Sequence, residues 1–158
     1  MDKAERSRLI ARYREGPDVL ATALAEVGED ALDATPPDGG WTPRQVVHHV
    51  ADSEMTSAIR LRRLLAEEQP VIQGYDEEEF ARRLFYDTRP VEPSLAAVRA
   101  ARASTASILD QLADSDWIRA GTHSELGPYS MEGWLRIYAE HCHDHAEQIR
   151  RARPRTRL

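Results

Sequence analysis

The sequence has a single cysteine, Cys142, among its 158 residues, so it cannot form an internal disulfide. A zinc site built from four cysteines is excluded for the same reason, and a bound metal would need histidine or carboxylate ligands. Single cysteines usually pack as small hydrophobic side chains, and we expect Cys142 to be buried in this way.

Long apolar runs are missing as well. No stretch approaches the roughly 20 residues that a membrane-spanning helix needs. Residues 1–16 alternate charged and apolar side chains, without the continuous apolar segment of a secretory signal. We therefore expect a cytoplasmic protein with no membrane partner.

Positive charge is in the minority, because 27 acidic residues outnumber 21 basic ones and leave a net charge of −6. Nucleic-acid binding needs concentrated positive charge, so we expect no nucleic-acid partner. The basic residues 150–158 are a local exception, and such a terminal segment is usually solvated. With no repeat and no break in composition, residues 1–158 are predicted to form one domain.

What the sequence does contain is helical periodicity. Residues 3–15 are predicted to form a short amphipathic helix that ends at Gly16-Pro17. Pro17 then suits the first position of the next helix. Residues 33–40, rich in proline and glycine, are predicted to be a loop.

Four long helices and almost no alternating strand pattern predict an all-α fold, a four-helix bundle with long crossover connections. A capping box formed by Thr42 and Gln45 marks the start of a long helix that runs to about Ala66. The remaining predictions are a short helix near Asp76–Leu84, a long helix from Pro93 and Ser94 through Leu112, a loop or short hairpin between Trp117 and Tyr129, and a last helix from Ser130 to about Arg151.

Five of the six histidines fall on two of the predicted long helices. On the last helix, His141 and His145 share an apolar stripe with Trp134, Tyr138 and Ile149, because residues four apart lie on one face. Buried imidazoles need partners, and two at this spacing can reach one zinc-like ion at about 2.0–2.1 Å. The alternative is a pair of core histidines bonded to backbone or carboxylate groups.

A third ligand is expected from the helix that begins at the capping box. His48 and His49 are adjacent there and flank its apolar face almost symmetrically, so periodicity does not decide between them. Asp52 and Glu54 follow closely, and either could orient a ligating imidazole or act as a base; ordinary surface carboxylates are the alternative. His143 lies on the far face of the last helix, and we expect it to be solvated.

Three blocks of the sequence resemble the DinB/YfiT-like superfamily, and YfiT-type metal-dependent hydrolases in particular. They are GWTPRQVVHHVADSE (Gly40–Glu54), YDEEEF (Tyr75–Phe80) and YAEHCHDHAEQI (Tyr138–Ile149). The resemblance implies a four-helix bundle with one metal ion, zinc or nickel, on three histidines. It also implies a homodimer.

Matching by position, the resemblance places the three metal ligands on His49, His141 and His145. It implies a metal-dependent hydrolase that activates water against a small-molecule substrate, with Asp52 and Glu54 as candidate acid or base groups. Relatives with such a site use low-molecular-weight thiols, bacillithiol or mycothiol, in S-transfer or isomerisation, which gives a thiol S-transferase as the second hypothesis. A non-catalytic metal-binding protein is the third.

Other side chains have weaker assignments. Four could shape a pocket, with ordinary packing or solvation as the alternative: Tyr75, Asp76, Arg136 and Tyr138. Trp41 and Trp134 are predicted to anchor the core, and His123 lies in a predicted loop without an assigned role.

Overall fold

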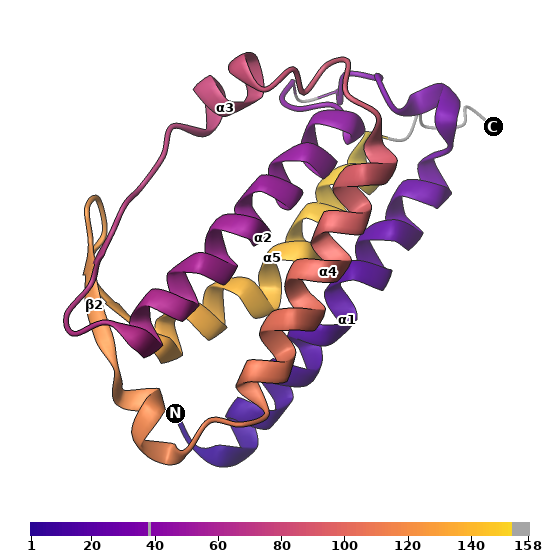
Figure 1. The fold of residues 1–158 in the computed structure, drawn as a ribbon. Helices are drawn as coiled ribbons and strands as arrows, with labels where there is room; N and C mark the ends of the chain where they lie inside the picture. The colour runs from indigo at the N-terminus through magenta and orange to yellow at the C-terminus, as the bar shows by residue number, and fades with distance from the viewer. Residues whose placement is uncertain (38, 153–158) are drawn as a thin grey trace.

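A computed structural model describes residues 1–37 and 39–152, and four long helices dominate it (Figure 1). Their bounds are Lys3–Val27 for α1, Pro43–Ala66 for α2, Val91–Leu109 for α4 and Met131–Arg151 for α5. α1 and α5 run in one direction and α2 and α4 in the other, so a long crossover must carry the chain from α2 back to the start of α4. Both α1 and α2 pack against α4 and α5. The prediction of a four-helix bundle with long crossovers is confirmed.

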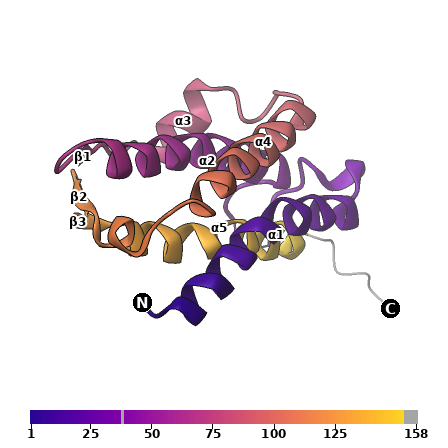
Figure 2. The same cartoon turned by 60° about the horizontal axis from the view of Figure 1, so that its bottom comes forward.

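A small three-stranded sheet, which the sequence only partly predicted, lies at the end of the bundle where α2 ends and α5 begins (Figure 2). The segment left open as a loop or hairpin is a hairpin, β2 (Ala120–His123) and β3 (Gly127–Ser130), preceded by a 3-10 helix at Asp114–Ile118. β1 (Val71–Ile72) pairs with β2 in parallel and was not predicted. Two residues are too few to show an alternating pattern.

The crossover between α2 and α4 contains β1 and the short helix α3 (Glu77–Arg83), close to its predicted position. Asp76 caps α3 by accepting a hydrogen bond from Glu79 N at 3.0 Å. A 3-10 helix at Glu29–Ala31 follows α1. Asp76 is therefore a helix cap, and its side chain is held at the start of α3.

The predicted break at Gly16-Pro17 is wrong, because α1 continues through it. Proline has no N–H to donate to the carbonyl four residues earlier, which is that of Tyr13. The buried guanidinium of Arg102 donates Nη1–H to this carbonyl instead. Gly16 lets the arginine approach, since a Cβ there would lie 2.3 Å from Arg102 Nη1 and 2.9 Å from Cys142 Cβ.

The other helix boundaries are close to those predicted. The capping box of Thr42 and Gln45 is present at the start of α2, and Ser130 caps α5 by accepting from Gly133 N at 3.0 Å. α4 begins before Pro93 and ends at Leu109, three residues before the predicted Leu112. A proline in the first turn costs no helical hydrogen bond, which explains the early start.

Two tryptophans and the single cysteine were predicted to pack in the core. Trp134 is fully buried and donates Nε1–H to the carbonyl of Ser57 at 3.0 Å. Cys142 is buried as expected, and burial raises the pKa of its thiol. Trp41 is only half-buried, and its ring packs on that of His49 with centroids 4.8 Å apart. Trp41 therefore packs against the core from its edge, and its predicted role as an anchor holds only in part.

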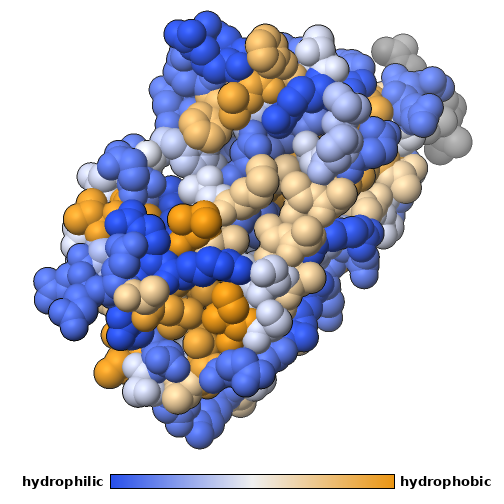
Figure 3. All heavy atoms as spheres, in the orientation of Figure 1, coloured by the Kyte–Doolittle hydropathy of each residue, from blue (hydrophilic) through white to orange (hydrophobic). Residues whose placement is uncertain are grey.

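The surface seen in the orientation of Figure 1 carries hydrophilic side chains with apolar patches between them (Figure 3). None of the described helices combines the length and apolarity that crossing a membrane requires. The basic segment 150–158 begins in the last turn of α5, where Arg150 pairs with Glu26 and Glu147. Residues 153–158 lie outside the described part of the chain.

Candidate metal centre

Three histidines from two facing helices converge inside the bundle. His49 comes from α2, and His141 and His145 lie one turn apart on α5. One ring nitrogen of each lies within 4.8 Å of those of the other two, and we call this group the histidine cluster. Within residues 1–37 and 39–152 it is the one group of three or more potential metal ligands this close together.

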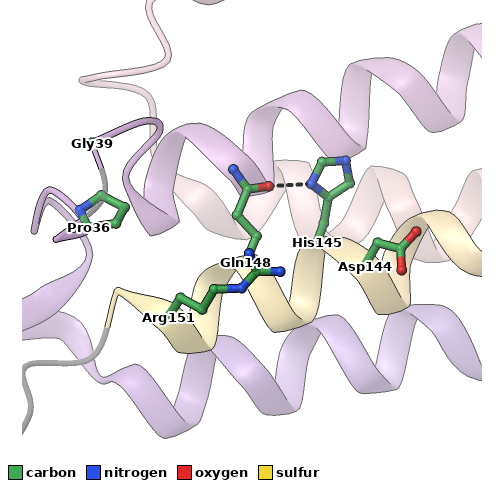
Figure 4. Close-up of a pocket in the computed structure, with 6 residues that line it drawn as sticks. All are labelled: Pro36, Gly39, Asp144, His145, Gln148 and Arg151. Carbon is green, nitrogen blue, oxygen red and sulfur yellow. Dashed lines mark hydrogen bonds between the residues drawn. The ribbon is translucent and has the colours of Figure 1, made fainter.

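The second ring nitrogen of each α5 histidine has an oxygen partner. His141 Nδ1 lies 3.0 Å from Glu54 Oε1, and His145 Nδ1 lies 2.7 Å from Gln148 Oε1 (Figure 4). Both oxygens are acceptors, so each Nδ1 carries a proton, and in the neutral ring Nε2 is the nitrogen with a free lone pair. Nδ1 of His49 is buried and has no hydrogen-bond partner among the described residues.

Burial keeps His49 and His145 uncharged. Desolvation, followed by the neighbouring rings of His145 and His141, lowers the pKa of His49 to about 3. Desolvation and then His141 lower the pKa of His145 to about 4. Neutral imidazole is the form that binds a divalent ion, and an orphaned ring nitrogen is an available ligand. The donor set fits one divalent ion of the zinc type.

A buried ion pair stands behind His141. The carboxylate of Glu54 is fully buried, and its Oε1 accepts from Arg102 Nη2 at 2.7 Å as well as from His141. Burial alone would raise the pKa of Glu54, but the charge of Arg102 and the two hydrogen bonds lower it below the ordinary value. Arg102 also donates to the carbonyl of Tyr138 at 2.7 Å. The thiol of Cys142 lies 3.8 Å from the same oxygen, so Glu54 is a carboxylate fixed in place with His141 as one of its three partners.

The neighbouring candidate His48 does not join the cluster. Its Nδ1 lies 2.8 Å from Ser94 Oγ on α4, and its Nε2 lies 3.1 Å from the carbonyl of Arg89. Adjacent residues on a helix point about 100° apart, so His48 faces α4 while His49 faces α5. The structure thus separates the two histidines that periodicity left equivalent.

Asp52 is likewise turned away from the histidines. Its Oδ2 accepts from the Tyr86 hydroxyl at 2.7 Å and lies 3.3 Å from Arg89 Nη2. None of its hydrogen bonds or ion pairs reaches the cluster. The structure brings Glu54 to the histidines and leaves Asp52 at the crossover.

Two remaining expectations concern side chains away from the cluster. His143 is half-buried, with Nε2 3.0 Å from the carbonyl of Arg12 on α1, so its expected solvation is wrong. Arg136 was a pocket candidate, but it forms a half-exposed ion pair with Glu5. Both residues belong to the contact between α5 and α1.

Two cavities border the histidine cluster. One, of about 290 Å³, is drawn in Figure 4 and is lined by Pro36, Gly39, Asp144, His145, Gln148 and Arg151. The second, of about 220 Å³, lies between the hairpin and the segment before α3, and it reaches His141. Tyr75 and Tyr138 both line this second cavity, and Tyr138 also packs in the core, so both alternatives left open for it apply. Each cavity therefore touches one histidine of the cluster, His145 in the first and His141 in the second.

Sequence reasoning missed three polar side chains around the cluster. Gln148 follows His145 by three residues, a spacing that places both on one helix face. Arg102 is the one charged residue on the buried face of α4, which was a signal that it has a buried partner. Arg60 lines the second cavity and has no comparable local signal, because that cavity forms only when the hairpin folds against α2.

The sequence profile of the DinB superfamily matches residues 12–149. OB0782 of Oceanobacillus iheyensis, which its name proposes as a metal-dependent hydrolase, is 38% identical over 84% of this chain and 77% of its own length. YfiT of Bacillus subtilis, named in the same way, is 34% identical over 94% of this chain and 84% of its own. The range matched by the superfamily profile includes all three histidines of the cluster.

Solved structures show the same fold. That of YfiT from Bacillus subtilis, described as a probable metal-dependent hydrolase with an unusual four-helix bundle topology, matches with a TM-score of 0.88 at 33% identity, over 94% of this chain and 86% of that one. A mycothiol-dependent maleylpyruvate isomerase matches with a TM-score of 0.74 at 12% identity, over 91% of this chain and 60% of that one. At 12% identity, the similarity to the isomerase shows only that the two proteins share a fold.

Proposed function

This chain belongs to the DinB superfamily, and we propose that it is a metal-dependent hydrolase that binds one zinc or nickel ion on His49, His141 and His145. The observation that carries the proposal is the convergence of one ring nitrogen from each of the three histidines within 4.8 Å of one another, beside two cavities that His145 and His141 line. The names of the similar relatives support the reaction class.

The protein supplies the ligands and their orientation. Glu54 and Gln148 accept the Nδ1–H groups of His141 and His145, which fixes both rings with Nε2 free for the metal. Three protein ligands leave at least one coordination position open. When bound there, a divalent ion activates water near neutral pH and polarises the carbonyl of an ester or amide.

Glu54 acts by positioning in this proposal. Its Oε1 accepts from the buried Arg102 and from the half-buried His141, and the carboxylate itself has no exposure to solvent with which it could exchange a proton. Of the two roles that the sequence allowed, orienting the ligand His141 suits a buried, ion-paired carboxylate better than that of a base.

The test is a panel of ester, amide and amidine substrates, assayed with metal-loaded and chelated protein. We expect hydrolysis that disappears on chelation, returns with zinc or nickel, and rises with pH near the pKa of activated water, about 7. A parallel arm supplies a low-molecular-weight thiol and a model electrophile. Conjugation there without hydrolysis in the first arm would contradict the proposal in favour of S-transfer, and metal-dependent stability with both arms blank would favour a non-catalytic protein.

We also propose that the protein is a homodimer. Met55 and Ile59 lie one helical turn apart on α2 and are 44% and 58% exposed. Apolar side chains stacked on one exposed helix face are typical of a surface that another chain covers. A molar mass of one chain by light scattering at micromolar concentration would contradict this.

A further inference from the structure

The second cavity beside the cluster, which we call the hairpin cavity, has polar walls whose hydrogen-bonding capacity is only partly used. It lies between α2, α5, the β2–β3 hairpin and the segment before α3, and it reaches His141 at one point. Its volume is about 220 Å³, enough for a small organic molecule but not for a polymer. Three of its side chains indicate which chemical group a bound molecule carries: Arg60, His123 and Tyr129.

Arg60 forms no ion pair with a described residue, although its charge is close enough to lower the pKa of Glu77, which burial raises. Its Nη2 donates to the carbonyl of Gln73 at 3.0 Å and its Nη1 to the Tyr138 hydroxyl at 3.2 Å. Its Nε is buried and makes no hydrogen bond to a described residue. No carboxylate in the described part of the chain pairs with Arg60, although most other arginines there form such pairs. A partly buried positive charge held by neutral acceptors favours a bound anion.

Tyr129 adds a buried donor. The residue is 5% exposed, and its hydroxyl makes no hydrogen bond of ordinary geometry within the described residues. Arg60 and the Tyr138 hydroxyl are nonetheless close enough to influence its pKa, which burial raises. A buried hydroxyl without a proper partner costs free energy unless a ligand completes it.

His123 presents a third donor to the same cavity. The residue is 4% exposed, and its Nδ1 accepts from the backbone N–H groups of Glu125 at 3.2 Å and Leu126 at 3.4 Å. The ring proton is therefore on Nε2, which donates to no described residue. The hairpin turn thus fixes the tautomer that leaves a donor free.

We propose that Arg60, His123 and Tyr129 form a subsite for one anionic oxygen group, a carboxylate of the substrate, within the hairpin cavity. The inference rests on the proposed function, because it assigns the group that the substrate carries beside the bond to be hydrolysed at the cluster. Glu77 and Glu125 also line the cavity and repel further negative charge. The substrate class is therefore a small carboxylic acid derivative, an ester or amide that bears a single carboxylate.

Binding to metal-free protein tests the subsite independently of hydrolysis. The probes are succinamate, which carries one carboxylate, and the neutral succinamide, titrated calorimetrically. We expect a Kd at least about tenfold lower for succinamate, the size of one charge-assisted hydrogen-bonded contact. Equal Kd values for the two probes would overturn the proposal, and so would binding of succinamate that requires added metal.

Two substitutions in the cavity test which side chains cause the preference for succinamate. Arg60→Gln should bring the two Kd values within about twofold of each other, and Tyr129→Phe, which preserves the shape of the side chain, should weaken succinamate binding about threefold or more. Arg62→Gln is the matched control, because Arg62 lies on the same helix and donates to Ser104 and Thr105 instead. A preference unchanged in both cavity variants would also overturn the proposal.

Hydrolysis assays show whether a failure concerns the subsite or the proposed hydrolase function. With metal-loaded protein, the monoanionic 4-nitrophenyl succinate should have a kcat/KM at least about tenfold above that of neutral 4-nitrophenyl acetate, and Arg60→Gln should remove this difference. Equal kcat/KM values for the two esters would contradict the subsite and leave the hydrolase intact. Failure of both esters would contradict the hydrolase, while the binding titration would still decide the subsite.

Discussion

Arg102 completes the hydrogen bonding of Tyr13, whose backbone carbonyl loses its helical N–H donor because Pro17 follows four residues later. The same guanidinium holds Glu54 at 2.7 Å, and Glu54 in turn holds His141 at 3.0 Å. A single buried side chain on α4 therefore has two effects: it stabilises α1 where Pro17 would otherwise break it, and through Glu54 it orients His141, a proposed metal ligand on α5.

Removal of Arg102 should be strongly destabilising. Arg102→Met leaves the carboxylate of Glu54 buried without its counter-charge, so we expect the free energy of unfolding to fall by about 3–5 kcal/mol. Urea denaturation of the chelated protein measures this. Arg99→Met, on the same helix in an exposed pair with Asp18, should cost less than about 1 kcal/mol. A loss for Arg102→Met no larger than that of Arg99→Met would show that the buried pair is not needed.

Neutralising Glu54 should weaken metal binding without abolishing it. Glu54→Gln keeps the size of the side chain but loses the charge that fixes the His141 ring, and we expect zinc affinity to fall about 10–100-fold. Asp52→Asn serves as the control, because Asp52 contacts Tyr86 and Arg89 and should leave the affinity within about twofold. Competition with a chromophoric chelator gives both values. Equal losses of zinc affinity in the two variants would contradict the role of Glu54 in holding His141.

The two glycines inside helices should respond to alanine in opposite directions. A Cβ at Gly16 would lie 2.3 Å from Arg102 Nη1, so Gly16→Ala should destabilise by about 1–3 kcal/mol despite the better helix propensity of alanine. Gly133→Ala meets only Ser130 Oγ at 3.3 Å and should be neutral or stabilising by up to about 1 kcal/mol. Thermal unfolding distinguishes them, and a stabilising Gly16→Ala would contradict the close approach of Arg102.

The metal-free protein should lose stability in mild acid. His49 and His145 have folded pKa values of about 3 and about 4, below the ordinary 6.5. Between about pH 6.5 and 4 the unfolded chain binds more protons, so the stability present above this window falls as pH falls, by up to about 1.4 kcal/mol per pH unit for each histidine. Urea denaturation of chelated protein across this range measures the slope, which His49→Gln should reduce. An identical slope in that variant would contradict a neutral, buried His49.

Much of the architecture could be predicted because its signals are local. The capping box of Thr42 and Gln45 lies within four residues, and the stripe that carries His141 and His145 lies within one helix. Such patterns need no knowledge of the rest of the chain.

The errors, and the choice between His48 and His49 that periodicity left open, involve partners distant in the sequence. Whether α1 breaks at Pro17 depends on Arg102, and the direction in which His48 points depends on Ser94 and Arg89, more than 40 residues away. β1 exists only because it pairs with the hairpin. Periodicity contains no information about these contacts, so neither the continuous α1 nor the donors of the hairpin cavity could be predicted.

The central claim, that three histidines from α2 and α5 share one ion, is tested most directly by elemental analysis of untagged protein after zinc or nickel loading and desalting. We expect about one equivalent in the unmodified protein and in His48→Ala and His143→Ala, whose rings bond to α4 and α1. His49→Ala, His141→Ala and His145→Ala should each lose most of the metal while remaining helical by circular dichroism. Retention of a full equivalent in those three variants would contradict the claim.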